Sequence, residues 1–417
     1  MTERQRPRRN YAVLLGQGVS NSAANELTSV KLVLPFLYTS VGAPVFFAGL
    51  LVPLYTVAKI AVQIVVAPIV SAARSNKKFM ILAGLATASA LVLISLTVDV
   101  VRAAWLVPIF LFAALAIGAA NGLGSLAFQN LIGRVLPSES RSRLLFTQSS
   151  LAGIFTVIVA LGSELILQPG TSTAAHQELI WLGISLFVIS ALLILAVREP
   201  EMPQPTGSRG ARESSRRHVA ELTESFRIAL ALPWFHRFLI ARSLFLSIEL
   251  AMPFYSIHAA TFHGNSVSGL NAFVIASSIG LVVGGLLWPR IGKGSVYTIL
   301  ALAAGTACLG GLLAIAIEFR LVSQAIYLYA IVFVLISLGA QGIKNGRNLY
   351  LIGMATDQER PYCIAVANVS IGVIAIAFGA VLGALASFRG VGWPIFVLIA
   401  LNILAAIYAL KLRNIRR

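Results

Sequence analysis

Two carboxylates, Glu26 and Glu249, stand inside long apolar stretches of this sequence. A carboxyl group held in a medium of low dielectric constant can bind and release a proton when its surroundings change. Charged groups in such stretches are costly to bury and usually face a cavity or each other. We therefore predict that Glu26 and Glu249 are proton-coupling groups at the edge of an internal cavity.

Amide and cationic side chains accompany these acids at helical spacing. One helical stripe, with Asn25 beside it, contains Gln17, Asn21, Thr28 and Lys31. A second stripe, flanked by Arg347, contains Gln341, Lys344, Asn345 and Asn348. Cations outnumber acids in this set, which favours an anionic or zwitterionic small molecule as the ligand. The candidate binding residues are Asn21, Asn25, Lys31, Lys59, Asn121, Gln341, Lys344, Asn345 and Arg347.

A structural interpretation competes with each of these assignments. Asn and Gln in membrane helices often do no more than hydrogen-bond a neighbouring helix. Lys344 and Arg347 can reach from their helix toward the water at one membrane surface. Lys59 can be a structural partner of Glu26 or Glu249. If both acids are locked in ion pairs, the protein works without proton coupling.

Other ionisable residues in or near the apolar stretches are not assigned to the binding site. Arg242 and Glu249 share one helical face but are about 10 Å apart along the axis, so each should meet a partner on another helix. Glu318 and His263 stand near the ends of apolar stretches and are expected to be solvated. His258 lies one turn further inside, and its role stays open.

The elements that must position these residues are membrane-spanning helices. The sequence is 58% hydrophobic and only 11% charged, against about 25% charged in a soluble domain. A bilayer-spanning helix needs about 20 mostly apolar residues. Twelve apolar stretches of about this length predict an all-α integral membrane protein with twelve spans. They lie near 11–38, 44–70, 79–99, 104–133, 144–167, 179–197, 237–261, 268–289, 297–317, 324–353, 361–388 and 392–411.

The placement of Lys and Arg predicts the orientation of these spans. The formal net charge is +17, yet the loops on one side hold only Arg102, Arg320 and Arg389. Loops rich in Lys and Arg stay in the cytoplasm. We therefore expect a multi-pass protein of the inner or plasma membrane with both termini in the cytoplasm.

The chain divides into two halves around its one long polar stretch. We predict a six-helix bundle over residues 1–197, a cytoplasmic linker over 198–236 and a second six-helix bundle over 237–417. The halves resemble each other when one is shifted by about 216 to 223 residues, which aligns Glu26 with Glu249 and Pro35 with Pro253. Such parallel repeats place a binding site between the halves near the middle of the bilayer.

With this topology and the loop after the second span, the chain resembles the major facilitator superfamily of transporters. That superfamily carries the pattern G-x-x-x-D-R-x-G-[RK]-[RK] in this loop, and Asn76 replaces its second Gly while Ala73 replaces its acid. Pro289 replaces the acid in the second copy. The residues that match the basic part of the pattern, and that the resemblance makes gating residues, are Arg74, Lys77, Lys78, Arg290 and Lys293.

The resemblance implies the fold of that superfamily, with two bundles related by a pseudo-two-fold axis. It also implies a secondary active transporter that works by alternating access, and we expect it to be coupled to protons. The alternatives are efflux of amphipathic drugs by proton antiport, and a membrane assembly factor or receptor that keeps the fold without transport. Aromatic residues support the first alternative, and the missing loop acids support the second.

The sequence does not favour an enzyme. No HExxH, GxSxG, Walker A or CxxC pattern occurs, and the acids are scattered and not paired at catalytic spacing. We expect a monomer in the lipid bilayer that binds a small-molecule substrate and H⁺, without a cofactor, a metal ion or nucleic acid.

Overall fold

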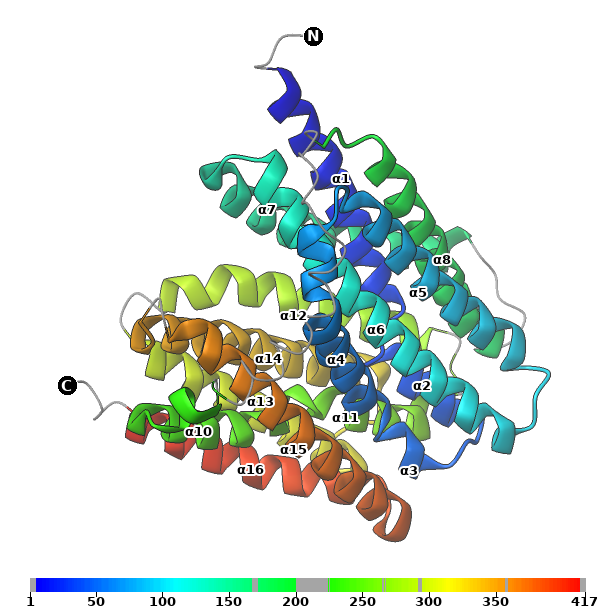
Figure 1. Ribbon diagram of the computed structural model, residues 1–417. Coiled ribbons are helices and arrows are strands. Elements are labelled where there is room, and N and C mark those ends of the chain that lie inside the picture. The colour runs from blue at the N-terminus through cyan, green and yellow to red at the C-terminus, as the bar shows by residue number, and fades with distance from the viewer. Residues whose placement is uncertain are drawn as a thin grey trace.

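The computed structural model describes residues 5–166, 172–199, 224, 226–264, 266, 268–291, 295–356 and 359–412. These residues form helices joined by short loops (Figure 1). The first part of the chain contains α1 (Gln5–Leu27), α2 (Val33–Ser40), α3 (Val45–Ala48), α4 (Leu51–Ala72), α5 (Lys77–Thr97), α6 (Ala103–Val135), α7 (Ser138–Ile166) and α8 (Ser172–Leu195). The second part contains α10 (Pro233–Glu249), α11 (Ala251–His263), α12 (Gly269–Ile291), α13 (Val296–Glu318), α14 (Ile326–Met354), α15 (Arg360–Arg389) and α16 (Gly392–Lys411).

Helices occupy all twelve positions where the sequence predicts a span. In the part of the chain that the structure describes, ten helical segments are long and apolar enough to cross a membrane. The other two positions are the α1 and α2 pair, which is interrupted and polar, and α7, whose apolar part covers Ser150–Gly162. The fold class is therefore an all-helical membrane protein, as predicted.

Two spans that were predicted to be continuous are broken. The first divides into α1 and α2 across residues 28–32, and the seventh divides into α10 and α11 at Leu250. Pro35 and Pro253 each lie in the first turn of the second piece. Proline has no N–H to bond the carbonyl four residues earlier, and its ring collides with that carbonyl. For Pro253 that carbonyl belongs to Glu249, the last residue of α10, so this proline ends the upstream helix. For Pro35 it belongs to Lys31, in the link that follows the end of α1 at Leu27.

Helices α1 to α8 pack mainly on one another, and so do α10 to α16. Figure 1 shows the first group, coloured blue to green, beside the second, coloured green to red. The groups touch where α2 packs on α11, where α15 packs on α3 and α4, and where α7 packs on α12. They diverge toward the ends that carry the chain termini. The exact limits 1–197, 198–236 and 237–417 remain predictions, because 200–223 and 225 lie outside the described residues and α10 begins at Pro233.

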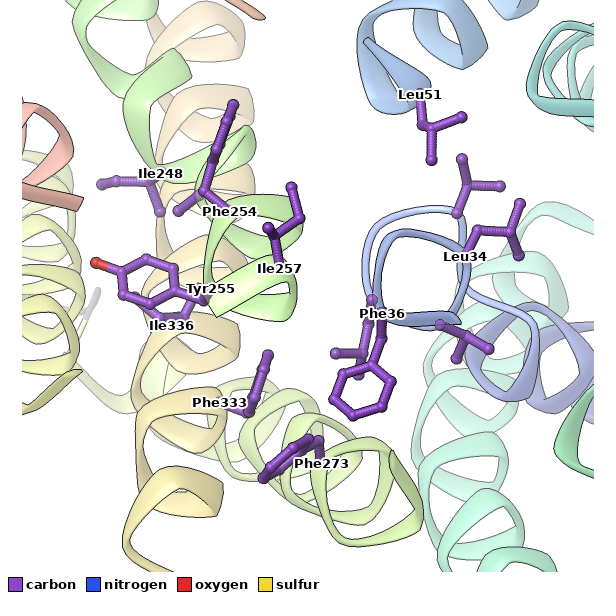
Figure 2. Close-up of a cluster of buried hydrophobic side chains, with 14 of the residues drawn as sticks. Leu34, Phe36, Leu51, Ile248, Phe254, Tyr255, Ile257, Phe273, Phe333 and Ile336 are labelled. Atoms are coloured by element: carbon purple, nitrogen blue, oxygen red, sulfur yellow. The ribbon is translucent and has the colours of Figure 1, made fainter. Parts of the chain in front are cut away.

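A continuous apolar core runs across the contact between the two groups. Phe36 of α2 points toward Phe273 of the second group in Figure 2, whereas Leu34 lies on the other side of α2, near Leu51. The Phe36 and Phe273 rings pack edge to face with centroids 5.8 Å apart. Because four of these side chains are completely buried, water is excluded from this side of the interface. The seal lies at the end of the molecule opposite the basic loops.

Glycines allow the closest helix contacts. A Cβ on Gly118 or Gly122 of α6 would collide with a backbone carbonyl of α4, from Tyr55 and Lys59 respectively. Gly383 and Gly379 of α15 are equally tight against Phe46 and Gly49 in the other group. The small-xxx-small spacing that predicts backbone approach is therefore used both within a bundle and between bundles.

A substitution of Gly118 by alanine should separate α4 from α6. We expect Gly118→Ala to destabilise the protein by about 1–3 kcal/mol, because the added methyl group meets backbone atoms that cannot move aside. Thermal unfolding in detergent measures the effect. Gly133→Ala is the matched control, since a Cβ at this position of the same helix meets no atom within 4 Å. Equal melting temperatures for the two variants would contradict the packing described above.

Candidate functional site

A cavity of about 220 Å³ lies between the two bundles at the helix breaks. Asn25, Glu26 and Lys31 line it from the first bundle, and Glu249 and Met252 line it from the second. The structure thus places both predicted proton-coupling carboxylates in one shared space. Glu26 lines this space from the end of α1.

The helix breaks explain why the two acids lie here. Glu26 is in the last turn of α1, and Glu249 is the last residue of α10. The C-terminal end of a helix carries a partial negative charge, which disfavours a carboxylate and favours nearby cations. Lys31 lies within electrostatic range of both acids, and Lys344 of α14 is also close to both. The cavity therefore combines two strongly negative points with a surrounding excess of cations.

Glu249 forms an ion pair with Arg347 of α14. Arg242, two turns earlier on α10, instead donates from Nη2 to Oδ1 of Asn368 on α15, at 2.8 Å. Both therefore meet partners on other helices, as their separation predicts. Lys59 forms no ion pair with either glutamate in the described part of the chain, and it is within electrostatic range of the cations Lys31 and Lys344.

A second cavity of about 460 Å³ adjoins this region inside the first bundle. Asn21, Lys59 and Asn121 line it, and Lys344 reaches it from α14 of the other bundle. Asn121 donates to the carbonyl oxygen of Ile117 at 3.0 Å, a bond within its own helix. This bond fixes the position of the side chain and uses its amide nitrogen. The amide oxygen can still accept a hydrogen bond from a ligand.

Three further candidate binding residues, Gln341, Asn345 and Arg347 of α14, lie in three different environments. The side chain of Gln341 fills the space that a Cβ at Gly284 of α12 would need, which is the helix-packing role that competed with binding. Asn345 is half-buried and lines none of the cavities described above. Arg347 lines a third cavity, of about 460 Å³, together with Arg242.

The first basic loop is held by a carboxylate that sequence analysis did not connect to it. Arg74, Lys77 and Lys78 line a cavity of about 1340 Å³ at the basic end of the first bundle. Glu199, after α8, accepts hydrogen bonds from Ser75 Oγ at 2.5 Å and from the Asn76 N–H at 2.9 Å. Glu199 therefore supplies the acid that the loop lacks at Ala73.

The second basic loop is only partly described. Arg290 donates from Nη1 to the carbonyl oxygen of Leu286 at 2.7 Å and is exposed. Lys293 lies outside the described residues. The gating role of both remains a prediction.

A buried polar cluster in the second bundle corrects one expectation. His258 is fully buried, its Nδ1 lies 2.5 Å from the Tyr329 hydroxyl, and its Nε2 lies 3.4 Å from Oε2 of Glu318. Glu318 and His263 were expected to be solvated, but His263 is buried and Glu318 turns toward the interior. The spacing of residues on separate helices gave no signal for this cluster, because it depends on how α11, α13 and α14 pack.

Comparison with known proteins decides the family. A model described as "Major Facilitator Superfamily" matches residues 18–343, which is more than half of the chain. The chain belongs to the major facilitator superfamily. It is therefore a secondary transporter of the membrane and not an enzyme, as the sequence predicted.

Sequence relatives occur in mycobacteria. Uncharacterized protein Rv2209 of Mycobacterium tuberculosis (strain ATCC 25618 / H37Rv) is 29% identical over 412 residues, covering 97% of this chain and 77% of the relative. Uncharacterized protein Mb2232 of Mycobacterium bovis (strain ATCC BAA-935 / AF2122/97) has the same identity and coverage. This likeness extends over nearly the whole chain, including both bundles.

Solved structures of this superfamily share the fold. A D-xylose-proton symporter superposes with a TM-score of 0.69 at 14% identity, covering 96% of this chain and 97% of that one. The nucleoside transporter NupG superposes with a TM-score of 0.66 at 12% identity, covering 98% and 100%. At these identities the likeness concerns the fold alone.

The ion pair between Glu249 and Arg347 should stabilise the fold only while both residues are present. We expect Arg347→Gln to destabilise the protein by about 1–3 kcal/mol, because it leaves a partly buried carboxylate without its contacting partner. A double-mutant cycle measures this interaction: the free energy of unfolding is compared for the unchanged protein, the two single variants and the Glu249→Gln, Arg347→Gln double variant. The double variant should be more stable than Arg347→Gln alone. Strictly additive effects would contradict a direct interaction.

Proposed function

We propose that this transporter carries a small anionic or zwitterionic solute across the membrane by alternating access, coupled to protons. The single observation that supports the substrate class is the charge balance between the bundles. Five cations and two carboxylates line the three cavities: Lys31, Lys59, Arg242, Lys344, Arg347, Glu26 and Glu249. An excess of positive charge in a region of low dielectric constant favours an anion and disfavours a cation.

Proton coupling is assigned first to Glu26. Glu249 is paired with Arg347, whereas Glu26 forms no ion pair in the described part of the chain and interacts with Lys31 and Lys344 only at longer range. A carboxylate without a fixed partner can change protonation at the smallest structural cost. Glu249 contributes when the two bundles rearrange and its contact with Arg347 on α14 opens.

The basic loops are proposed to face the cytoplasm, following the distribution of Lys and Arg. The apolar seal around Phe36 and Phe273 then lies on the outer side, and the described conformation opens inward. Rocking of the two bundles about the central cavity would break this seal and close the basic end. Glu199, which holds the loop at Ser75 and Asn76, belongs to the contacts that change.

Efflux of amphipathic drugs is less well supported. It needs a weakly charged aromatic cavity, yet Phe245, Phe254, Tyr255 and Tyr350 are almost completely buried in helix packing. A protein that keeps the fold without transport is also less well supported, because a purely structural chain would gain nothing from unbalanced charge between its bundles.

Transport in proteoliposomes tests the proposal. We expect protein-dependent uptake of a labelled carboxylate, amino acid or phosphate ester that a pH gradient increases, and no uptake of a cationic amphiphile. Liposomes without protein are the control. Absence of flux for every anionic and zwitterionic class, with flux of the cationic amphiphile, would overturn the substrate class.

Glu26→Gln should separate transport from proton coupling. We expect the variant to keep solute exchange down a gradient and to lose accumulation driven by a pH gradient, because an amide cannot carry the proton. A pH-sensitive dye inside the liposomes measures the accompanying proton flux. Glu224→Gln, an exposed carboxylate outside the membrane helices, is the matched control. Undiminished pH-driven accumulation by Glu26→Gln would remove this residue from coupling.

A further inference from the structure

A third cavity, of about 460 Å³, lies between α10, α14 and α15 of the second bundle. Arg242, Arg347, Asn348 and Asn368 supply its polar lining. Phe238, Leu351 and Ile364 supply its apolar wall. Cavities of this size hold small organic ligands, and a few convergent polar groups on an apolar wall are typical of a ligand site.

The two arginines of this cavity are not equivalent. Arg347 is neutralised by Glu249. Arg242 has a neutral partner, Oδ1 of Asn368, and its Nε is buried without a hydrogen-bond partner. No carboxylate pairs with Arg242 among the residues that the structure describes. Arg242 is half-buried and interacts with Glu249 only through space, so its guanidinium contacts no carboxylate among the residues that the structure describes.

Such a charge requires an explanation. Removing a charged group from water costs several kcal/mol unless an opposite charge compensates it. An arginine inside a membrane bundle that only linked α10 to α15 could be replaced by a neutral amide at lower cost. The lack of a carboxylate in contact with Arg242 is accounted for if the ligand itself brings a negative charge into the cavity.

We propose that Arg242, with Asn348 and Asn368 beside it, forms an oxyanion-binding subsite for a carboxylate or phosphate group. The inference rests on the proposed function and deepens it, because it assigns the anionic end of the solute to the second bundle. The planar guanidinium presents parallel N–H donors that match the two oxygens of a carboxylate or phosphate. A bound oxyanion would satisfy Nε and neutralise the charge in one contact.

Thermal unfolding of the purified full-length protein in detergent tests this assignment. Sodium succinate and sodium phosphate are the two probes, compared with sodium chloride at equal ionic strength and with uncharged succinamide. At saturation we expect one oxyanion to raise Tm by at least about 2 °C, because a ligand that binds the folded state stabilises it. Succinamide should give no shift. The better probe distinguishes a carboxylate site from a phosphate site.

Arg242→Gln should abolish this shift. Without an oxyanion its Tm should equal or exceed that of the unchanged protein, because a partly desolvated charge that contacts no carboxylate has been removed. Arg237→Gln, five residues away on the exposed face of α10, is the matched control and should keep the shift. If Arg242→Gln does not fold, Arg242→Lys decides, since it keeps the charge without the planar donors and should weaken binding at least about tenfold.

Two results would overturn the subsite. One is a shift of equal size in Arg242→Gln and in the unchanged protein, and the other is the absence of any oxyanion-dependent shift. Either result leaves the transport assay intact, so flux without a role for Arg242 would reject this subsite alone. Absence of flux would reject the proposed function itself.

Discussion

The structure depends on how positive charge is held between two apolar bundles. Lys31, Lys59, Lys344 and the two arginines line the cavities, and only Glu26 and Glu249 oppose them there among the described residues. Charge in such a place is stable only when it is paired, hydrated or bound to a ligand. Because the first two cavities are lined from both bundles, their charge balance changes whenever the bundles move. A transporter can use that dependence to link the binding of an anion to a conformational change.

Broken helices and glycine contacts are the means by which this arrangement is built. α1 and α10 end inside the first and seventh spans, ahead of Pro35 and Pro253, and each has a glutamate in its last turn. Gly379 and Gly383 let α15 approach the other bundle closely on the sealed side. The charged groups are thus concentrated at one level, while apolar contacts close the path on one side of it.

Much of this could be predicted from the sequence, because membrane spans depend on hydropathy and length. The positions of the helices, the internal repeat and the family followed from apolar stretches, the loop pattern around Arg74 and the alignment of Glu26 with Glu249. The helix breaks were missed even though both prolines were aligned, since a proline in a span can also produce only a kink. The shared cavity around both glutamates agrees with the repeat, whose symmetry requires equivalent positions to face each other.

Contacts between distant helices could not be predicted in the same way. Pairing of Glu249 with Arg347, and of Arg242 with Asn368, depends on the rotation of each helix in its bundle. The contact of Glu199 with the loop at Asn76 depends on where the chain leaves α8. The His258, Tyr329 and Glu318 cluster joins three helices and has no local pattern at all. Polar spacing along one helix shows which face is polar but not which helix it meets.

The central claim is that the cavity between the bundles opens to each side of the membrane in turn. Cys308 and Cys363 are free thiols in the structure, so replacing both by serine gives a background for a single Ser29→Cys probe in the cavity. Its reaction with a membrane-impermeant thiol reagent is measured in inside-out and right-side-out vesicles. We predict modification from both faces, slowed by a transported anion. Modification from one face only, under all solute conditions, would contradict alternating access.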